Sequence, residues 1–259
     1  MNPNSEDIFR AHLFEEPLVP IGGEPTPAEN AALATALLGY SKRSGPDDFS
    51  SLTGFLDALP NSHWNPAVLT NLGLEYYHTG HYSKALDAWG QAWERASSDT
   101  DVRGKALADR AAGELAAMHA SLGHMAELEA LLRSTAGRVF VGPATERICG
   151  AREGLANMQF RPETAFRCGP LALHRIKLTL DPHNPGTELI HASASTQMGF
   201  TLCQVAELSQ RLGLYFQMAY REQGAAFVVP SVVHLKVDHY AALVRREGDR
   251  YLLQDPTFR

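Results

Sequence analysis

Three residues in the C-terminal part of the chain carry side chains that together could cleave an amide bond. Cys168, His239 and Asp255 follow one another in that order. A thiolate attacks carbonyl carbon, a histidine can take up and return a proton, and a carboxylate can hold the imidazole in one tautomer. Residues of these types therefore predict nucleophilic catalysis through an acyl-enzyme, provided that the fold brings them together.

Cys168 is expected at the start of a helix, where a thiolate is favoured. Pro170 suits the first turn of a helix, and the positive end of the helix dipole lowers the pKa of a thiol placed there. Gly169 leaves room for a substrate backbone beside the sulfur. The alternative is a buried structural cysteine, the usual environment of a lone cysteine, and this is the interpretation for Cys149 and Cys203.

His239 and Asp255 are expected at one end of an antiparallel hairpin. His239 begins a predicted strand and Asp255 follows the next one, and the head of one strand lies beside the tail of its antiparallel partner. His239 could then act as general base and Asp255 could orient its imidazole. His234 is the rival histidine, expected to be a packed or edge residue of the preceding strand. Taken alone, Asp255 before Pro256 could also be a turn former.

The segments around these residues predict helices followed by an antiparallel sheet, which is an α+β order. Thr201 and Gln204 have the spacing of a capping box, and Gly213 suits the position just after a helix. The expected helices cover residues 170–180 and 202–212, and the expected strands cover residues 226–236, 240–246 and 251–254.

The N-terminal part predicts helices after an irregular segment. Prolines and glycines interrupt residues 1–27, so this segment is expected to lack regular structure. The remainder has strong helix propensity with an apolar stripe. Three helices are expected here. The first begins at Pro27, the second covers residues 48–59 with Asp47 or Asp48 as its cap, and the third covers residues 144–158.

Small and aromatic residues between these helices have the spacing of a helical hairpin. Gly73 and Ala85 would let two helices approach closely, Gly80 would form the turn, and Tyr76 and Trp89 would fill the space between them. The pattern resembles a tetratricopeptide repeat, and one repeat needs neighbouring helices to bury its apolar face. Residues 28–158 are therefore expected to form one tetratricopeptide-like helical domain. The matching positions also include Leu72, Tyr82 and Ala92, and a weaker copy follows at Leu115, Ala116, His119, Gly123, Met125, Leu128 and Leu132 after an inserted loop at residues 96–102.

Residues 159–259 resemble the papain-like cysteine peptidases that process bacteriocin leaders after a Gly-Gly pair, the double-glycine peptidase family. The resemblance implies a papain-like α+β domain in which Cys168 is the nucleophile, His239 the general base and acid, and Asp255 the orienting residue. The matched segments are Cys168-Gly169-Pro170-Leu171-Ala172-Leu173, Gly199-Phe200-Thr201-Leu202, Gly213-Leu214, Phe227-Val228-Val229-Pro230, His239-Tyr240-Ala241-Ala242-Leu243-Val244 and Asp255-Pro256.

The chain departs from this family at the oxyanion donor. The family places a glutamine shortly before the cysteine, where this chain has Pro162, and the nearest glutamine is Gln159. Either Gln159 donates from a longer loop, or the backbone N–H of Cys168 serves together with another group. Loss of one donor can remove about 2.7–4 kcal/mol of transition-state stabilisation, so this departure bears on activity.

The composition argues against several other classes of protein. A formal net charge of −6 gives no basic surface for nucleic acid. No apolar run is long enough to span a membrane and the N-terminus lacks signal-peptide features, so we expect no direct membrane insertion and a cytoplasmic location, with export by another route left open. Three cysteines fit a reducing compartment and lack zinc-site spacing, and no phosphate-loop motif occurs, so no cofactor is expected.

Two functions of different classes remain after these considerations. The first is a thiol-dependent peptidase whose helical repeats bind or orient a peptide or protein partner. The second is a non-catalytic interaction module with a degenerate peptidase fold, and transfer in place of hydrolysis would use the same three residues. Because the chain stops soon after Asp255, at Arg259, we expect a truncated domain, further domains of a longer chain, and residue 259 beside the core.

Overall fold

The computed structural model describes residues 3–255 and residue 257. The expectation for residue 259, like the one for Pro256, therefore lies outside the described residues. The chain divides into two compact units. The first unit contains the residues up to Met118 and Ala130–Gly150, and the second contains His119–Glu129 and the residues from Ala151 onward.

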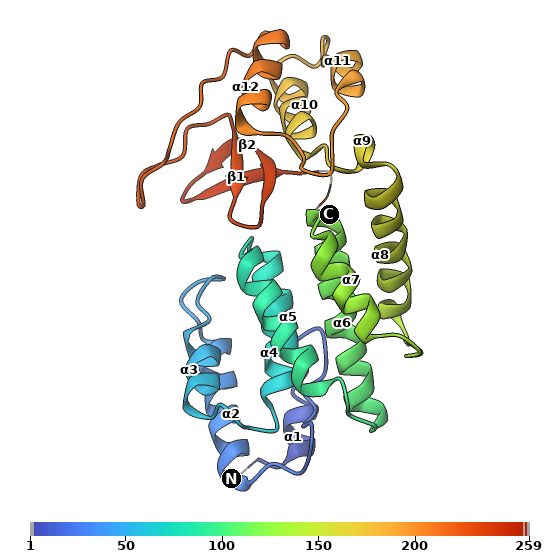
Figure 1. Cartoon of the computed structure of the whole chain (residues 1–259). Coiled ribbons are helices and arrows are strands. Elements are labelled where there is room, and N and C mark those ends of the chain that lie inside the picture. Colours follow the sequence, from blue (N-terminus) through green and yellow to red (C-terminus); the bar gives the residue numbers. More distant parts are fainter. Residues whose placement is uncertain (1–2, 256, 258–259) are drawn as a thin grey trace. The chain divides into compact units, whose positions relative to one another are not determined.

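The first unit is helical (Figure 1). Its N-terminal segment corrects the expectation of irregular structure over residues 1–27, because Asn4 and Asp7 form a capping box at the start of a short helix. Apolar side chains of this segment, among them Ile8, Leu18 and Ile21, are buried, which explains why it is ordered. The helices are α1 (Ser5–Phe9), α2 (Pro27–Ser41), α3 (Ser50–Ala58), α4 (Asn65–His78), α5 (Tyr82–Ala96) and parts of α6 (Val102–Leu122), α7 (Met125–Ser134) and α8 (Pro143–Phe160).

One helix cap and one domain boundary differ from the expected positions. The N-cap of α3 is Phe49 rather than Asp47 or Asp48, although the Asp48 carboxylate accepts a hydrogen bond from the Ser50 backbone N–H at 3.2 Å. The division expected between residues 158 and 159 falls inside α8, a continuous helix. The later part of α8 packs in the second unit, where a Cβ on Gly154 would lie 3.2 Å from the Cβ of Ala120.

Helices α4 and α5 form the hairpin expected from the small and aromatic residues. Gly80 makes the turn with φ +80°, in the left-handed region that glycine adopts without strain. Trp89 is 1% exposed, and its indole N–H donates to the carbonyl of Thr70 at 3.2 Å. A Cβ on Gly73 would lie 2.3 Å from Trp89 Nε1, so only glycine lets the indole pack against α4 at this position.

We expect Gly73→Ala to destabilise the protein by about 1–3 kcal/mol, because the added methyl group must displace the Trp89 ring. Gly90→Ala in α5 is the matched control, since a Cβ there meets no atom within 4 Å. This second change should stabilise the protein by about 0.5–1 kcal/mol through helix propensity. Urea unfolding of both variants checks the pair, and equal effects would contradict the packing described for α4 and α5.

The second unit combines helices with a small antiparallel sheet, and the predicted α+β order is confirmed (Figure 1). The strand order is β1-β2-β3, with both pairs antiparallel. Short helices α9 and α11 had no clear sequence signal. The elements beyond α8 are α9 (Pro162–Ala165), α10 (Cys168–Leu180), α11 (Thr187–Ala192), α12 (Leu202–Arg211), β1 (Ser231–Leu235), β2 (His239–Glu247) and β3 (Arg250–Gln254).

Several local predictions in this unit are confirmed. Thr201 and Gln204 form a capping box at the start of α12, and Gly213 follows the helix with φ +73°.

The first strand, expected from residue 226, begins only at Ser231. The residues before Ser231 lie outside the sheet, with Val228 77% exposed.

The core of the second unit lies between α10, α12 and the sheet. Helix α10 packs against β2, contributing Leu173 and Ile176, which are fully buried. From β2, alternate residues reach this core because side chains of a strand alternate between its faces. The remaining members are Ala172, Ile190, Val205, Leu208, Leu212, Tyr240, Ala242 and Val244. This core fixes the start of α10 beside the start of β2.

Candidate thiol site

Cys168 is the first residue of α10, as the Pro170 signal predicted. The helix begins with the hydrogen bond from Leu171 N–H to the carbonyl of Arg167 at 3.0 Å. The backbone N–H groups at the very start of a helix have no partner within it, and they point toward the anion-binding end. The cysteine is free and half-buried, a setting in which an anionic sulfur can be both stabilised and reached.

Gly169 keeps the neighbourhood of the sulfur closely packed. A Cβ at this position would lie 2.7 Å from a methyl group of Val205 and 3.5 Å from the Tyr240 ring. The absence of a side chain therefore lets α10 approach α12 and β2 beside Cys168. This differs from the expected role of Gly169, an open approach for substrate, because the space left by its missing side chain is occupied by Val205 and Tyr240.

His239 is the first residue of β2 and is 2% exposed. A short turn precedes it, and Leu235 and His239 form the last pair of the β1–β2 ladder. Asp238, the last residue of the turn, has φ +52°, a conformation that aspartate tolerates better than most residues. His239 is thus held at the rim of the sheet by its strand and by the geometry of the turn.

Asp255 follows β3 directly and meets His239, as the hairpin argument predicted. Ala242 pairs with Gln254, so one further step of the ladder places Asp255 two positions from His239. The Asp255 Oδ2 atom lies 2.5 Å from His239 Nε2, and both side chains are only 3% exposed. The other oxygen, Oδ1, accepts a hydrogen bond from the Thr257 backbone N–H at 2.7 Å, which fixes the carboxylate.

The electrostatics of the site favour a charged pair. Burial alone would raise the pKa of the Cys168 thiol, but hydrogen bonds from the His239 side chain and from the Tyr240 and Gly169 backbone N–H groups outweigh it, so the thiol pKa is lowered. Burial would lower the pKa of His239, but hydrogen bonds to Asp255 and Cys168, together with their charges, raise it to about 9. The pKa of Asp255 is lowered, because the hydrogen bond and charge of His239 outweigh burial.

This arrangement can perform nucleophilic chemistry near neutral pH. The pKa of the Cys168 thiol is lowered and the pKa of His239 is raised to about 9, so the site favours a thiolate beside an imidazolium over the neutral pair. A thiolate is the reactive form of cysteine, and an imidazolium can protonate a leaving group. The buried Asp255 carboxylate balances the charge of the ring and holds its orientation.

Gln159 lies elsewhere than its expected role requires. It is exposed on α8, and its amide Nε2 lies 2.5 Å from Glu129 Oε1 on α7. The structure therefore gives this donor a carboxylate partner on the surface. The second option, the backbone N–H of Cys168 at the start of α10, remains available for an oxyanion.

The rival residues occupy ordinary positions. His234 is exposed and stacks on Tyr240, its partner across the β1–β2 ladder, with ring centroids 4.5 Å apart. Cys149 and Cys203 are free and exposed, which corrects their interpretation as packed residues. The Tyr240 backbone N–H, which helps to hold the sulfur, was not anticipated, because a backbone group has no signature in residue type.

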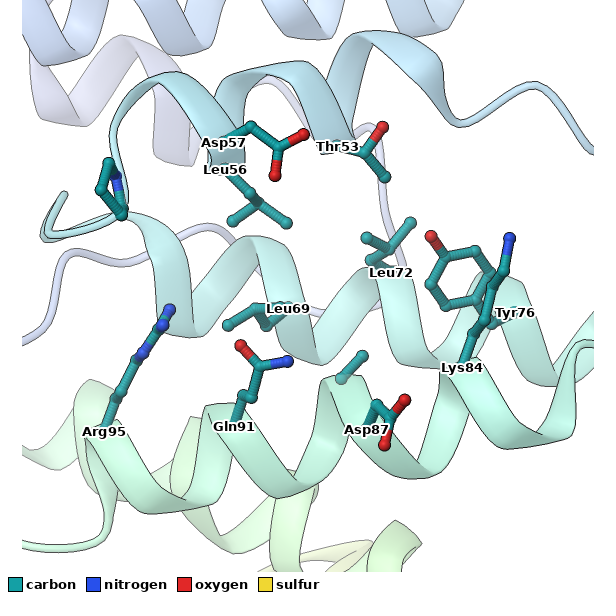
Figure 2. Close-up of a pocket in the computed structure, with 12 residues that line it drawn as sticks. Thr53, Leu56, Asp57, Leu69, Leu72, Tyr76, Lys84, Asp87, Gln91 and Arg95 are labelled. Atoms are coloured by element: carbon teal, nitrogen blue, oxygen red, sulfur yellow. The ribbon is translucent and has the colours of Figure 1, made fainter. Parts of the chain in front are cut away.

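The first unit carries a groove between α3, α4 and α5, shown in Figure 2. Its volume is about 460 Å³, and Leu69, Leu72 and Tyr76 of α4 form its floor. Its walls carry polar side chains. Among the residues that the structure describes, five of these side chains form no hydrogen bond or ion pair, although Lys84 lies over the Tyr76 ring: Asp57, Lys84, Asp87, Gln91 and Arg95.

Neither the family models nor the curated proteins nor the solved structures that were compared with this chain gave a match. Within residues 3–255 and 257, no three histidine, cysteine, aspartate or glutamate side chains are grouped to hold a metal ion. No helix in the same part of the chain has the length and apolar character needed to cross a bilayer.

Proposed function

We propose that this chain is a papain-like cysteine peptidase, similar in its catalytic domain to the double-glycine peptidases, and that its helical part holds a peptide or protein partner. The observation that carries the proposal is the continuous chain of contacts from Asp255 through His239 to Cys168. Each member sits at the end of a different element, α10, β2 or β3, and the buried pair raises the pKa of His239 to about 9. Such a combination of perturbed ionisable groups is typical of catalytic sites.

In the proposed reaction, the Cys168 thiolate attacks the carbonyl carbon of a peptide bond and forms a tetrahedral intermediate. The carbon–nitrogen bond then breaks, the amine leaves with the proton of the His239 imidazolium, and the acyl group remains on the sulfur as a thioester. His239, now neutral, removes a proton from water, which attacks the thioester carbonyl. The acid leaves, and the imidazolium and thiolate are regenerated. The backbone N–H of Cys168 is the donor that we assign to the oxyanion.

The helical unit is proposed to contribute partner binding through the groove of α3, α4 and α5 (Figure 2). Its apolar floor suits one or two apolar side chains of a peptide. The unpaired Asp57 and Gln91 on its two walls can bond to backbone amide groups or polar side chains of the same peptide. The α4–α5 hairpin, with Gly73 packed on Trp89, supports the tetratricopeptide-like interpretation of this unit.

The test of peptidase activity is the appearance of new peptide termini. We expect the purified chain to cleave a peptide mixture prepared from a digested proteome, and mass spectrometry of the new N-termini to give its preference. Cys168→Ala should reduce the cleavage rate by a factor of at least about 10³, because nucleophilic catalysis is removed. Cys203→Ala, at an exposed free cysteine, is the matched control and should cleave like the unaltered chain.

The alternative is a non-catalytic interaction module, and the observation that favours it is the groove of α3, α4 and α5. It predicts that the chain releases no new termini, while a peptide from the same mixture is retained by the chain and lost with Leu72→Arg on the groove floor. Transfer in place of hydrolysis would appear as joining of the acyl fragment to the amino group of an added acceptor peptide, with little release of the free acid. New termini that persist in Cys168→Ala would contradict the proposed nucleophile.

A further inference from the structure

The turn between α6 and α7 is a rigid element of the second unit. Gly123 has φ +78° at the end of α6, and the backbone N–H of His124 donates to the carbonyl of His119 at 3.0 Å. This is the hydrogen-bond pattern of a helix closed by a glycine in the left-handed conformation. The next helix starts at once, since Leu128 N–H donates to the carbonyl of His124 at 3.0 Å. The backbone of His124 is therefore held from both sides.

The two histidines of this turn form a directed chain of hydrogen bonds. His124 Nε2 lies 3.1 Å from the carbonyl oxygen of Val237, and a carbonyl oxygen can only accept. His124 therefore carries its proton on Nε2, which leaves a lone pair on Nδ1 when the ring is neutral. The Nδ1 atoms of His119 and His124 are 3.2 Å apart, so His119 is the donor to this lone pair.

The charge state of His119 agrees with that direction. Burial and the nearby His124 lower the pKa of His119 to about 4, against the opposing effect of Glu127. His119 is thus a neutral donor at pH 7. The ring orientation of His124, and with it the hydrogen bond to Val237, is held by a neighbour that does not change its charge near neutral pH.

The same turn touches both segments that carry the thiol site. Val237 lies two residues before His239, in the turn whose last residue, Asp238, has a positive φ. Gly123 contacts the ring of Phe166, two residues before Cys168, because a Cβ on Gly123 would lie 2.9 Å from Phe166 Cε1. One turn therefore supports the chain immediately before the cysteine and immediately before the histidine.

We propose that the α6–α7 turn is a positioning element of the thiol site, in which His124 holds the Val237 carbonyl and Gly123 packs on Phe166 so that His239 and Cys168 stay within reach of each other. This inference rests on the proposed function and adds a part of the chain that the sequence pattern assigned to a weak helical repeat. His124 is a positioning residue, because it acts through the backbone that precedes His239 and not on a reacting atom.

The experiment measures the alkylation of Cys168 by iodoacetamide in the full chain as a function of pH, with mass spectrometry to identify the modified residue. We expect His124→Leu to slow the reaction about tenfold at pH 7. The acidic limb of the plot of rate against pH should also move to higher pH, because a displaced His239 no longer lowers the pKa of the thiol. His124→Gln, whose amide can donate to Val237, should restore the rate to within about twofold.

The matched control is His183→Leu, at an exposed histidine of the same unit, which should leave the profile unchanged. If His124→Leu fails to fold, the pair His119→Leu and His119→Asn decides, with a slower reaction for leucine and recovery for asparagine, which keeps a donor. The proposal is overturned if the acidic limb of the rate–pH plot is unaltered in the folded leucine variants, or if the amide variants do not recover the alkylation rate. That result would leave the proposed function intact, because peptide cleavage by the unaltered chain is measured separately.

Discussion

Iodoacetamide should modify Cys168 at pH 7 about tenfold faster than it modifies Cys149 or Cys203. An ordinary exposed cysteine is only a few per cent thiolate at this pH, whereas the lowered pKa of Cys168 increases the share of the anion. The larger share of thiolate speeds the reaction, and the lower nucleophilicity of a stabilised thiolate offsets part of that gain. Peptide mapping after brief labelling gives the three rates in one sample.

His239→Gln is the variant that links this reactivity to the site. It removes the imidazolium that holds the thiolate, so the rate at Cys168 should fall to that of the other two cysteines. His234→Gln, at an exposed histidine of the neighbouring strand, is the matched control and should change nothing. Equal labelling of all three cysteines in the unaltered chain would contradict an activated thiol.

The two kinds of measurement should have different pH profiles. Alkylation needs only the thiolate, so it should fall as the pH drops through the lowered pKa of Cys168 and stay high on the alkaline side. Peptide cleavage also needs the proton of His239, so it should decline again as the pH rises through about 9. An alkylation profile with the same alkaline limb would indicate that the limb reports unfolding.

The parts of the site that the sequence predicted are those with local signals. Pro170 marked the first turn of α10, and the two strand patterns with a turn between them placed His239 and Asp255 at one end of a hairpin. Thr201 with Gln204 marked the start of α12. Each of these signals works because the residues that specify the element are within a few positions of it.

The parts that the sequence did not predict depend on contacts between distant segments. The hydrogen bond from His124 to Val237 joins residues 113 positions apart, and neither a histidine nor a valine in the sequence indicates such a partner. The sequence places Gln159 shortly before Cys168, but the helical path of α8 turns its amide to Glu129. The ends of α6 and α8 belong with the second unit because of packing, which periodicity along one helix does not reveal.

Asp255→Ala should reduce the free energy of unfolding at pH 7 by roughly 3 kcal/mol. The substitution leaves the buried His239 without its charge partner, and breaking a buried pair in this way costs about 3–5 kcal/mol. The hydrogen bond to Asp255 is the largest of the interactions that raise the pKa of His239 from 6.5 to about 9, and Cys168 adds to it. Asp249→Ala, in the exposed turn before β3, is the matched control.

The pH dependence separates this electrostatic effect from simple loss of packing. In the folded chain the pKa of His239 is raised above its unfolded value, so its stabilisation is complete below pH 6.5 and is lost as the pH rises through about 9. The difference in stability between the unaltered chain and Asp255→Ala should therefore be largest near neutral pH and shrink toward pH 10. Urea unfolding at several pH values measures it. A difference that stays constant across this range would mean that Asp255 acts by filling space and not by holding a charged His239, and the orienting role in the proposed triad would then be lost.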